Sequence, residues 1–448
     1  MNRNALLTRL LMLLVLLPSV VACTEVDLCE EAEHPHRAHT MFHFDWQGYT
    51  DRPDSMLIAS IRVLNLWKCG IIFSTKAGDP NYGRYVYNPP EIQPEWAYDE
   101  YWNPPPPVVT PPKPGEFIFD TETDYSPKPF VPDPEITQFE HFALRDGTYK
   151  FLAVNKDATE VDVSAVYNFL RATGDTLQMT DVRLRYLTYE REDTAFLANL
   201  DSAVHERIMS WADYNPVLPY IKSNITPLYY DVVDHVNIYK EKTTNDVTFR
   251  PRPVTQNIDV YVDFEKDISE VPFTVDTVLA EVAGIPLRIS LVDGYIDMSS
   301  TAKMIFTTEL MSGGHTPIAA DSPASTQVSA HGRISVTTVI ANQNESNITG
   351  PGIMQLLLHC TAINPADGSL KTKWIPGRVN MSKTLERSKL IELTDDGQHA
   401  RQSAPNGVIN LKIETKLKGK DILDNSDESG GVITWTEAAD IDIPEWLE

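Results

Sequence analysis

Short segments in which apolar and polar residues alternate limit what this chain can fold into. The clearest runs from Gln256 to Phe264, where every second residue is apolar or aromatic. A period of two is typical of a strand with one buried face. Similar strand-like segments are expected at 41–46, 57–67, 84–87, 139–144, 147–155, 179–189, 229–239, 247–250, 287–293, 334–341, 353–362, 370–375 and 407–417. Many short strands joined by turns favour β-sandwiches.

Helical spacing of apolar residues occurs in two places, at 162–172 and 192–212. Pro251 and Pro253 then separate two strong strand patterns, and we place a domain boundary there. The expected fold is therefore mainly β, with two tandem sandwich domains of the transthyretin-like or immunoglobulin-like kind and a few short helices. The first domain would span 41–250 and the second 251–448.

A proline-rich insert interrupts the first domain at 89–134 and contains 14 of the 32 prolines. Proline has no amide donor and cannot sit inside a sheet ladder, so the segment is interpreted as an extended loop, in part polyproline II. Its aromatic residues either pack the loop onto its own domain or form a surface that stacks on a ligand: Trp96, Tyr98, Tyr101 and Trp102.

The N-terminus has the order of a secretory signal at 1–22. Arg3 and Arg9 precede eight apolar residues at 10–17, and Ala22-Cys23 follows a stretch of small residues. The apolar run is too short to cross a bilayer, which needs about 20 residues. A cysteine after a small residue at this point resembles a lipobox. We expect cleavage between Ala22 and Cys23 and acyl chains such as palmitate on Cys23, while an ordinary secreted protein is the alternative.

An acidic tether follows the acylated cysteine at 23–40. Five acidic residues precede the first basic one, Arg37. This pattern is similar to the export signal of lipoproteins on the outer face of the outer membrane, and a merely solvated tether is the alternative. The net charge of −25 disfavours nucleic acid as a partner.

Several segments together resemble fimbrillin-like outer-membrane lipoproteins of the type V pilus superfamily. They are the aromatic strand 42–46, the turn-glycine strand 144–155, the crossing at 247–254 and the closing segment 430–435 with 441–443. The resemblance implies two transthyretin-like sandwiches and an anchor or accessory subunit of a fimbria. Such subunits bind one another by strand addition, and the terminal strand 431–443 would be exchanged or would close the second sandwich. The insert at 89–134 and the helical stretch at 192–212 depart from the family pattern.

No residue pattern predicts catalysis, and we expect a protein that is not an enzyme and has no cofactor or metal site. His205 and Glu206 lack the second histidine of a zincin motif, because Met209 occupies that position. Cys69 and Cys360 are interpreted as buried thiols. One group of histidines lies mostly on the tether, where a metal site would lack an ordered backbone: His34, His36, His39 and His43. One acidic group lacks the spacing of an EF-hand and is interpreted as a solvated turn: Asp421, Asp424, Asp427 and Glu428. The alternative function is a surface glycan-binding lipoprotein of a nutrient-uptake system.

Overall fold

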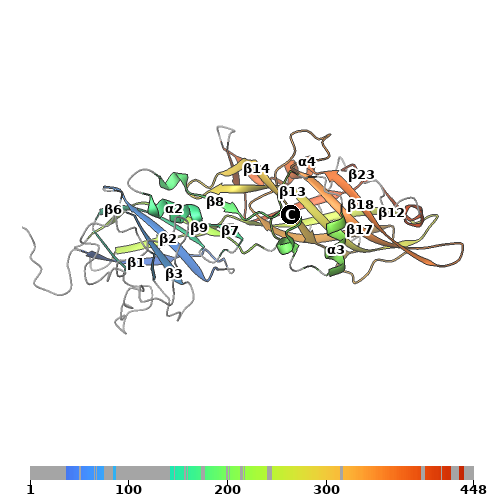
Figure 1. Cartoon of the computed structure of the whole chain (residues 1–448), viewed down its shortest axis with the longest axis horizontal. Helices are drawn as coiled ribbons and strands as arrows, with labels where there is room; N and C mark the ends of the chain where they lie inside the picture. Colours follow the sequence, from blue (N-terminus) through green and yellow to red (C-terminus); the bar gives the residue numbers. More distant parts are fainter. Residues whose placement is uncertain are drawn as a thin grey trace, which may run out of the picture.

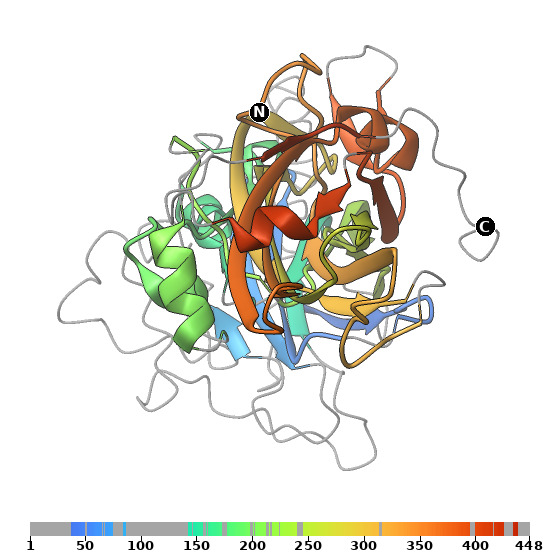
Figure 2. The ribbon, with the colours of Figure 1, turned by 90° about the vertical axis from the view of Figure 1, so that its right-hand side faces the viewer.

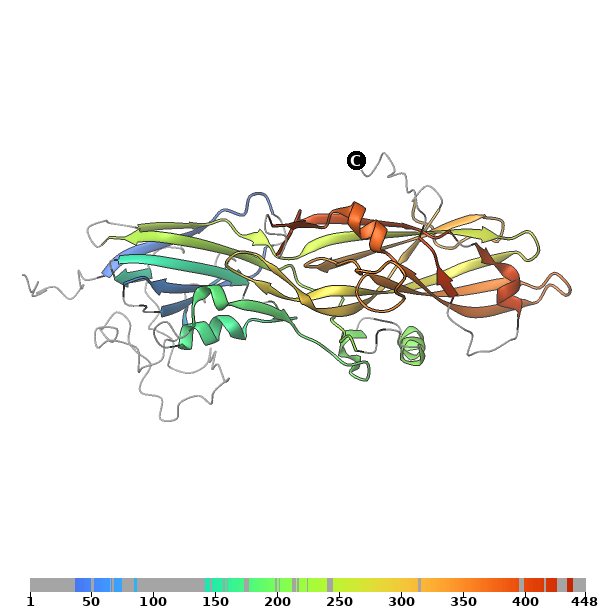
Figure 3. The ribbon, with the colours of Figure 1, turned by 90° about the horizontal axis from the view of Figure 1, so that it is seen from above.

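Two β-sandwiches lie end to end along the long axis of the molecule in the computed structural model (Figure 1, Figure 3). The structure describes residues 37–49, 52–64, 66, 68–74, 84–86, 142–145, 147–155, 158, 160–172, 177–197, 200, 202–211, 215, 217–223, 225–239, 245–312, 316–394, 399–414, 416–424 and 433–437. Within these residues, no helix has the length and hydropathy needed to cross a membrane. The expectation of a mainly β chain with a few short helices is confirmed.

The first sandwich pairs a three-stranded sheet, in the order β10-β1-β5, with a six-stranded sheet, in the order β11-β9-β6-β2-β3-β4. Rings of Phe42, Phe151 and Phe249 meet between the sheets, with Phe42 at 5.6 Å from Phe151 and 5.9 Å from Phe249. Burial of these rings stabilises the pairing of the two sheets. The strands are β1 (Arg37–Phe44), β2 (Ser55–Arg62), β3 (Lys68–Ser74), β4 (Arg84–Val86), β5 (Phe142–Arg145), β6 (Gly147–Asn155), β9 (Tyr229–Ile238), β10 (Asn245–Phe249) and β11 (Arg252–Pro253).

The second sandwich has a smaller sheet in the order β15-β16-β12-β21 and a larger one in the order β19-β20-β14-β13-β17-β18-β23. The alternating segment noted in the sequence is β12, which buries every second residue. The bounds are β12 (Gln256–Asp267), β13 (Phe273–Ser290), β14 (Ile296–Thr307), β15 (Glu309–Met311), β16 (Gln327–Val336), β17 (Ile353–Ile363), β18 (Leu370–Asn380), α4 (Ser382–Ser388), β19 (Ile391–Leu393), β20 (Ala400–Gln402), β21 (Asn406–Lys412), β22 (Leu417–Lys418), α5 (Gly419–Leu423) and β23 (Ile433–Trp435).

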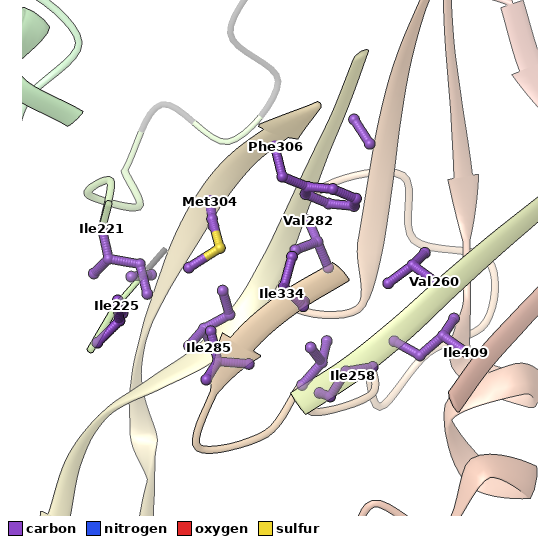
Figure 4. Close-up of a cluster of buried hydrophobic side chains, with 14 of the residues drawn as sticks. Ile221, Ile225, Ile258, Val260, Val282, Ile285, Met304, Phe306, Ile334 and Ile409 are labelled. Carbon is purple, nitrogen blue, oxygen red and sulfur yellow. The ribbon is translucent and has the colours of Figure 1, made fainter. Parts of the chain in front are cut away.

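The main core fills the space between these two sheets and extends into the first sandwich. In Figure 4, Val260 of β12, Val282 of β13 and Ile334 of β16 point toward one another across it. Ile221 and Ile225, from the segment before β9, join the same cluster. Close packing of such side chains is the main stabilising contribution in a β-sandwich.

A segment that precedes residue 251 crosses onto the second sandwich. The strands β7 (Val161–Asp162) and β8 (Arg183–Tyr186), which lie before and after α2 (Ser164–Arg171) in the chain, extend the larger sheet, because β8 pairs with both β7 and β13. The 3₁₀ helix η4 (Thr194–Leu197) and helix α3 (Ser202–Ser210) then lie beside the outer face of that sheet (Figure 2). Trp211 and Tyr220 share one buried cluster there with Leu357 of β17. The larger sheet is therefore buried on both faces in this region.

Some expected elements differ from those observed. The segment 57–67 ends as a strand at Arg62, and Leu66 has a positive φ of 55° that a strand cannot accommodate. Met179 begins the 3₁₀ helix η3 (Met179–Asp181) and not a strand. The segment 192–212 is divided between η4 and α3. The expected strand 287–293 is the end of the much longer β13, and β1 begins at Arg37, ahead of the expected 41.

Candidate functional site: the seat of the terminal strand

The second sandwich is closed at one edge by β23, which is the described part of the predicted terminal strand 431–443. Ile433, Thr434 and Trp435 pair in parallel with residues 377–379 of β18. Two residues further on, Glu437 bridges to Ile413, which follows β21 in the smaller sheet, and the amide of Glu414 donates to the carbonyl of Thr436 at 3.1 Å. The terminal strand thus contacts both sheets, and residues 431–432 and 438–443 lie outside the described residues.

Trp435 anchors this strand to the core. Its side chain is 3% exposed, and its ring packs edge-on against Phe264 with 5.9 Å between the centroids. On the other side the ring lies directly over Gly377, where a Cβ atom would overlap it. Glycine is needed here because only its backbone leaves room for the indole. We call the surface formed by Gly377, Phe264, Ile413 and Thr384 the terminal-strand seat.

Glu437 lies in the same seat and is 6% exposed. Its Oε1 accepts a hydrogen bond from the hydroxyl of Thr384, on α4. Burial raises the pKa of the Glu437 carboxyl, and the hydrogen bond from Thr384 and the charges of Arg387 and Lys383 offset this only in part. Next to Glu437 and Trp435 a cleft of about 240 Å³ opens toward Glu345. The seat therefore contains one acid whose charge opposes the docking of the terminal strand.

We expect Glu437→Gln to stabilise the docked terminal strand at pH 7 and to lose this advantage as the pH is lowered toward 4. A carboxyl whose pKa is raised in the folded protein destabilises the fold where it is ionised. The wild type is therefore most stable below the unfolded pKa of about 4.3, and it loses stability as the pH rises through the folded pKa. Chemical denaturation of both proteins across this range measures the difference. Glu345→Gln, in the exposed part of the cleft, is the control. An advantage of Glu437→Gln that is the same at pH 4 and pH 7 would contradict the expectation.

Most of the sequence-predicted site residues lie outside the described residues. These are the cleavage pair Ala22 and Cys23, the tether up to residue 36, and the aromatic residues Trp96, Tyr98, Tyr101 and Trp102. Their expected roles therefore stay predictions. Among residues that are described, Cys360 is a buried free thiol whose pKa is raised by burial, as the sequence predicts, and Cys69 lies on β3 of the other sandwich.

Of the histidine and acidic groups discussed above, His34, His36, Asp427 and Glu428 lie outside the described residues. His43 lies 2.9 Å from a carboxylate oxygen of Asp246, on the surface of the first sandwich. The backbone carbonyls of Asp421 and Asp424, and not their carboxylates, accept hydrogen bonds from the ammonium group of Lys373. In the part of the chain that the structure describes, no group of three or more histidine, cysteine or acidic side chains is placed to hold a metal.

Comparison with known proteins gives similarity to solved structures only. No family model and no curated protein sequence matches the chain. A candidate adhesin from Bacteroides ovatus aligns with 11% identity and a TM-score of 0.38, over 88% of this chain and 94% of that one. The fimbrial anchor protein Mfa2 from Porphyromonas gingivalis aligns with 9% identity and a TM-score of 0.32, over 84% and 91%. A candidate polysaccharide-binding protein from Bacteroides thetaiotaomicron aligns with 11% identity and a TM-score of 0.33, over 85% and 92%.

One of these structures is a fimbrial anchor protein, which is the kind of protein that the fimbrillin-like resemblance implies. The TM-scores are too low to assign a function by likeness. The function proposed below therefore depends on the residues of this chain.

Proposed function

We propose that the chain is an adhesion-related surface lipoprotein of fimbrial type, without enzymatic activity, which binds a neighbouring subunit by strand addition at the terminal-strand seat. One observation supports this proposal above all. The second sandwich is completed by a short terminal strand that pairs with β18 and also contacts the smaller sheet. A strand in that position can be replaced by one of similar sequence from another molecule, because main-chain hydrogen bonds supply most of the attraction.

The energetics of β23 favour replacement. Among the described residues, its pairing with β18 is parallel and extends over three residue pairs, and parallel pairing is slightly weaker per residue than antiparallel pairing. Glu437 opposes docking near neutral pH, because its carboxyl is buried and its pKa is raised. Trp435 supplies the specific contact, since its indole fills the space above Gly377. An incoming strand would need a large flat side chain at the same position.

Anchoring at the cell surface is the second part of the proposal. Its support is the signal-like segment at 1–22 and Cys23 after a small residue. Two or more acyl chains on one cysteine would hold the chain stably in a membrane, where a single chain binds only marginally. The acidic tether at 23–40 would then place the first sandwich away from the anionic membrane surface.

Surface labelling of intact cells that carry the wild type or Cys23→Ala tests this part, together with recovery of crosslinked partners. We expect Cys23→Ala to remove nearly all of the surface signal, and the wild type to bring fimbrial subunits with it. Cys360→Ala, which removes the buried thiol of β17, is the matched control and should keep the surface signal. An undiminished surface signal for Cys23→Ala would exclude the lipid anchor. Recovery of a nutrient transporter in place of fimbrial subunits would exclude the fimbrial role.

A further inference from the structure

A cleft of about 180 Å³ lies where the two sandwiches meet, and none of its lining residues belongs to the terminal-strand seat. The first sandwich contributes Tyr49 and Tyr230, and the connecting segment contributes Arg252. The second sandwich contributes Asp293, from the turn between β13 and β14, and Arg401 of β20. We call this the arginine cleft. Junctions between domains are common places for small-ligand sites, because two surfaces converge there without close packing.

Two guanidinium groups are held at this cleft by aromatic rings. The Cζ atom of Arg252 lies 4.8 Å from the ring centroid of Tyr230, and that of Arg401 lies 4.6 Å from the centroid of Tyr295. Stacking of this kind fixes the plane of a guanidinium and leaves its N–H groups free at the edges. Within the described residues, neither arginine forms an ion pair. Two unpaired arginines beside one cleft are unexpected in a chain with a net charge of −25.

Tyr230 adds a hydroxyl donor to the cleft. Its side chain is 4% exposed and lines the cleft, yet its hydroxyl has no hydrogen-bond partner among the residues that the structure describes. The hydroxyl lies against Gly294, where any larger residue would displace it. Burial raises the pKa of the Tyr230 phenol, so this group remains a protonated donor at neutral pH. A hydroxyl that lines a cleft in this way can donate a hydrogen bond to a bound ligand or to water.

The acidic groups near the cleft offset the arginine charges only in part: Asp231 interacts electrostatically with Arg252, and within the described residues neither Asp231 nor Asp293 forms an ion pair with Arg252 or Arg401. Asp231 accepts a hydrogen bond from the amide of Arg250 at 2.7 Å, and Asp293 accepts one from the amide of Tyr295 at 3.2 Å. Asp293 still has acceptor capacity toward the cleft, because an ionised carboxylate has about four lone-pair positions. The cleft therefore combines two planar cations, one hydroxyl donor and one carboxylate acceptor.

We propose that the arginine cleft binds one carboxylate-bearing sugar unit, such as a uronic or sialic acid. The guanidinium groups of Arg252 and Arg401 match the geometry of a carboxylate, to which each can donate two hydrogen bonds. Tyr230 donates to a ring substituent or to the carboxylate, and Asp293 accepts from sugar hydroxyls. The volume is below the range of about 300–1,000 Å³ that is typical of drug-sized ligands, and so suits a single ring. This proposal is independent of strand addition and would make the lipoprotein an adhesin for acidic glycans.

Calorimetric titration of the detergent-solubilised full chain tests the proposal, with galacturonic acid, N-acetylneuraminic acid, neutral galactose and tetraglutamate as probes. We expect at least one acidic sugar to bind, and galactose to bind at least about tenfold more weakly. Arg252→Ala and Arg401→Ala should each weaken binding about tenfold, and Tyr230→Phe about threefold, because each removes donors to the ligand. Arg333→Ala, on the surface of β16, is the control and should bind as the wild type does.

Several results would overturn the inference. Equal binding of galactose and the acidic sugars would show that the carboxylate is not recognised. Binding that survives both Arg252→Ala and Arg401→Ala would place the ligand elsewhere. The absence of binding of either acidic sugar at about 10 mM would also contradict the proposal. Binding of tetraglutamate alone would contradict it as well and would indicate an acidic protein partner. Unchanged melting temperatures would show that the variants are folded, since both arginine side chains lie at the surface.

Discussion

Replacing Lys266 with methionine is expected to lower the free energy of unfolding by about 3–5 kcal/mol, because it leaves the charge of Asp321 buried without a partner. The side chain of Lys266 is 0% exposed and that of Asp321 is 2% exposed. The ammonium group of Lys266 forms an ion pair with Asp321. It also donates a hydrogen bond to the carbonyl of Ser322 at 3.0 Å and lies 4.8 Å from the ring centroid of Phe273. The carboxylate of Asp321 also accepts a hydrogen bond of 3.1 Å from the backbone amide of Val275. This group connects β12 of the smaller sheet to β13 of the larger one.

Urea denaturation of the wild type and Lys266→Met measures the change. Arg333→Ala is the matched control, because Arg333 pairs with Asp259 through two bonds of 2.9 Å but is 65% exposed. Its loss should cost about 1 kcal/mol or less. Lys266→Met with Asp321→Leu should recover most of the stability, since apolar residues of similar volume often replace a buried ion pair without loss. A change below about 1 kcal/mol for Lys266→Met alone would mean that water reaches the pair.

The sequence predicts those strands that bury one face, because apolar and polar residues alternate along them. It does not predict strands that are buried on both faces. The strand β6 has the predicted bounds of 147–155, and β12 shows the predicted alternation. Most of β13 was not predicted, because it is buried on both faces and contains Gly284 and Pro286, which usually mark the end of a strand. In the fold both lie at shifts of register between β13 and β14, where the ladder is locally broken.

The docking of α3 shows a second limit of sequence patterns. The helical spacing at 192–212 predicts a helix here, but nothing in the sequence predicts the surface that receives it. That surface consists of Leu279, Ile305 and Leu357, from three different strands of the larger sheet. In a two-layer sandwich these positions would face water, so their apolar character has meaning only once a third layer is known. No local sequence pattern connects helix α3 with the sheet surface on which it packs.

Both candidate sites depend on residues that are distant in sequence. Trp435 was part of a predicted closing strand, whereas its contact with Gly377 arises only through the pairing of β23 with β18. Arg252 and Arg401 lie about 150 residues apart and line the same cleft because β11 and the segment around β20 both face the junction. Neither arginine belongs to a motif. Spatial arrangement, and not spacing along the chain, defines these sites.

Locking the terminal strand in its seat is expected to reduce the capture of fimbrial partners at least about tenfold, if β23 must leave for a neighbouring strand to enter. Thr434 and Arg378 are register partners on the outer side of the strand pair, opposite in direction to the buried Trp435. Cysteines at both positions would lie within the Cα separation of about 4.4–6.8 Å that a disulfide requires. The lock raises the cost of releasing β23, and a tenfold loss corresponds to about 1.4 kcal/mol.

Partner capture by the oxidised and reduced forms of the same Arg378→Cys/Thr434→Cys protein gives the cleanest comparison, because both forms have identical sequences. Reduction should restore capture, while the single variant Thr434→Cys should not respond to oxidant. Trp435→Ala provides the opposite perturbation: it removes the anchor of β23, costs about 3–5 kcal/mol of local or global stability, and should make the seat easier to enter. If the locked and reduced forms capture partners equally well, then β23 closes the sandwich permanently and partners bind at another edge. If Trp435→Ala increases capture while the lock abolishes it, then the seat is the place where subunits join, because the two changes act in opposite directions on a single equilibrium.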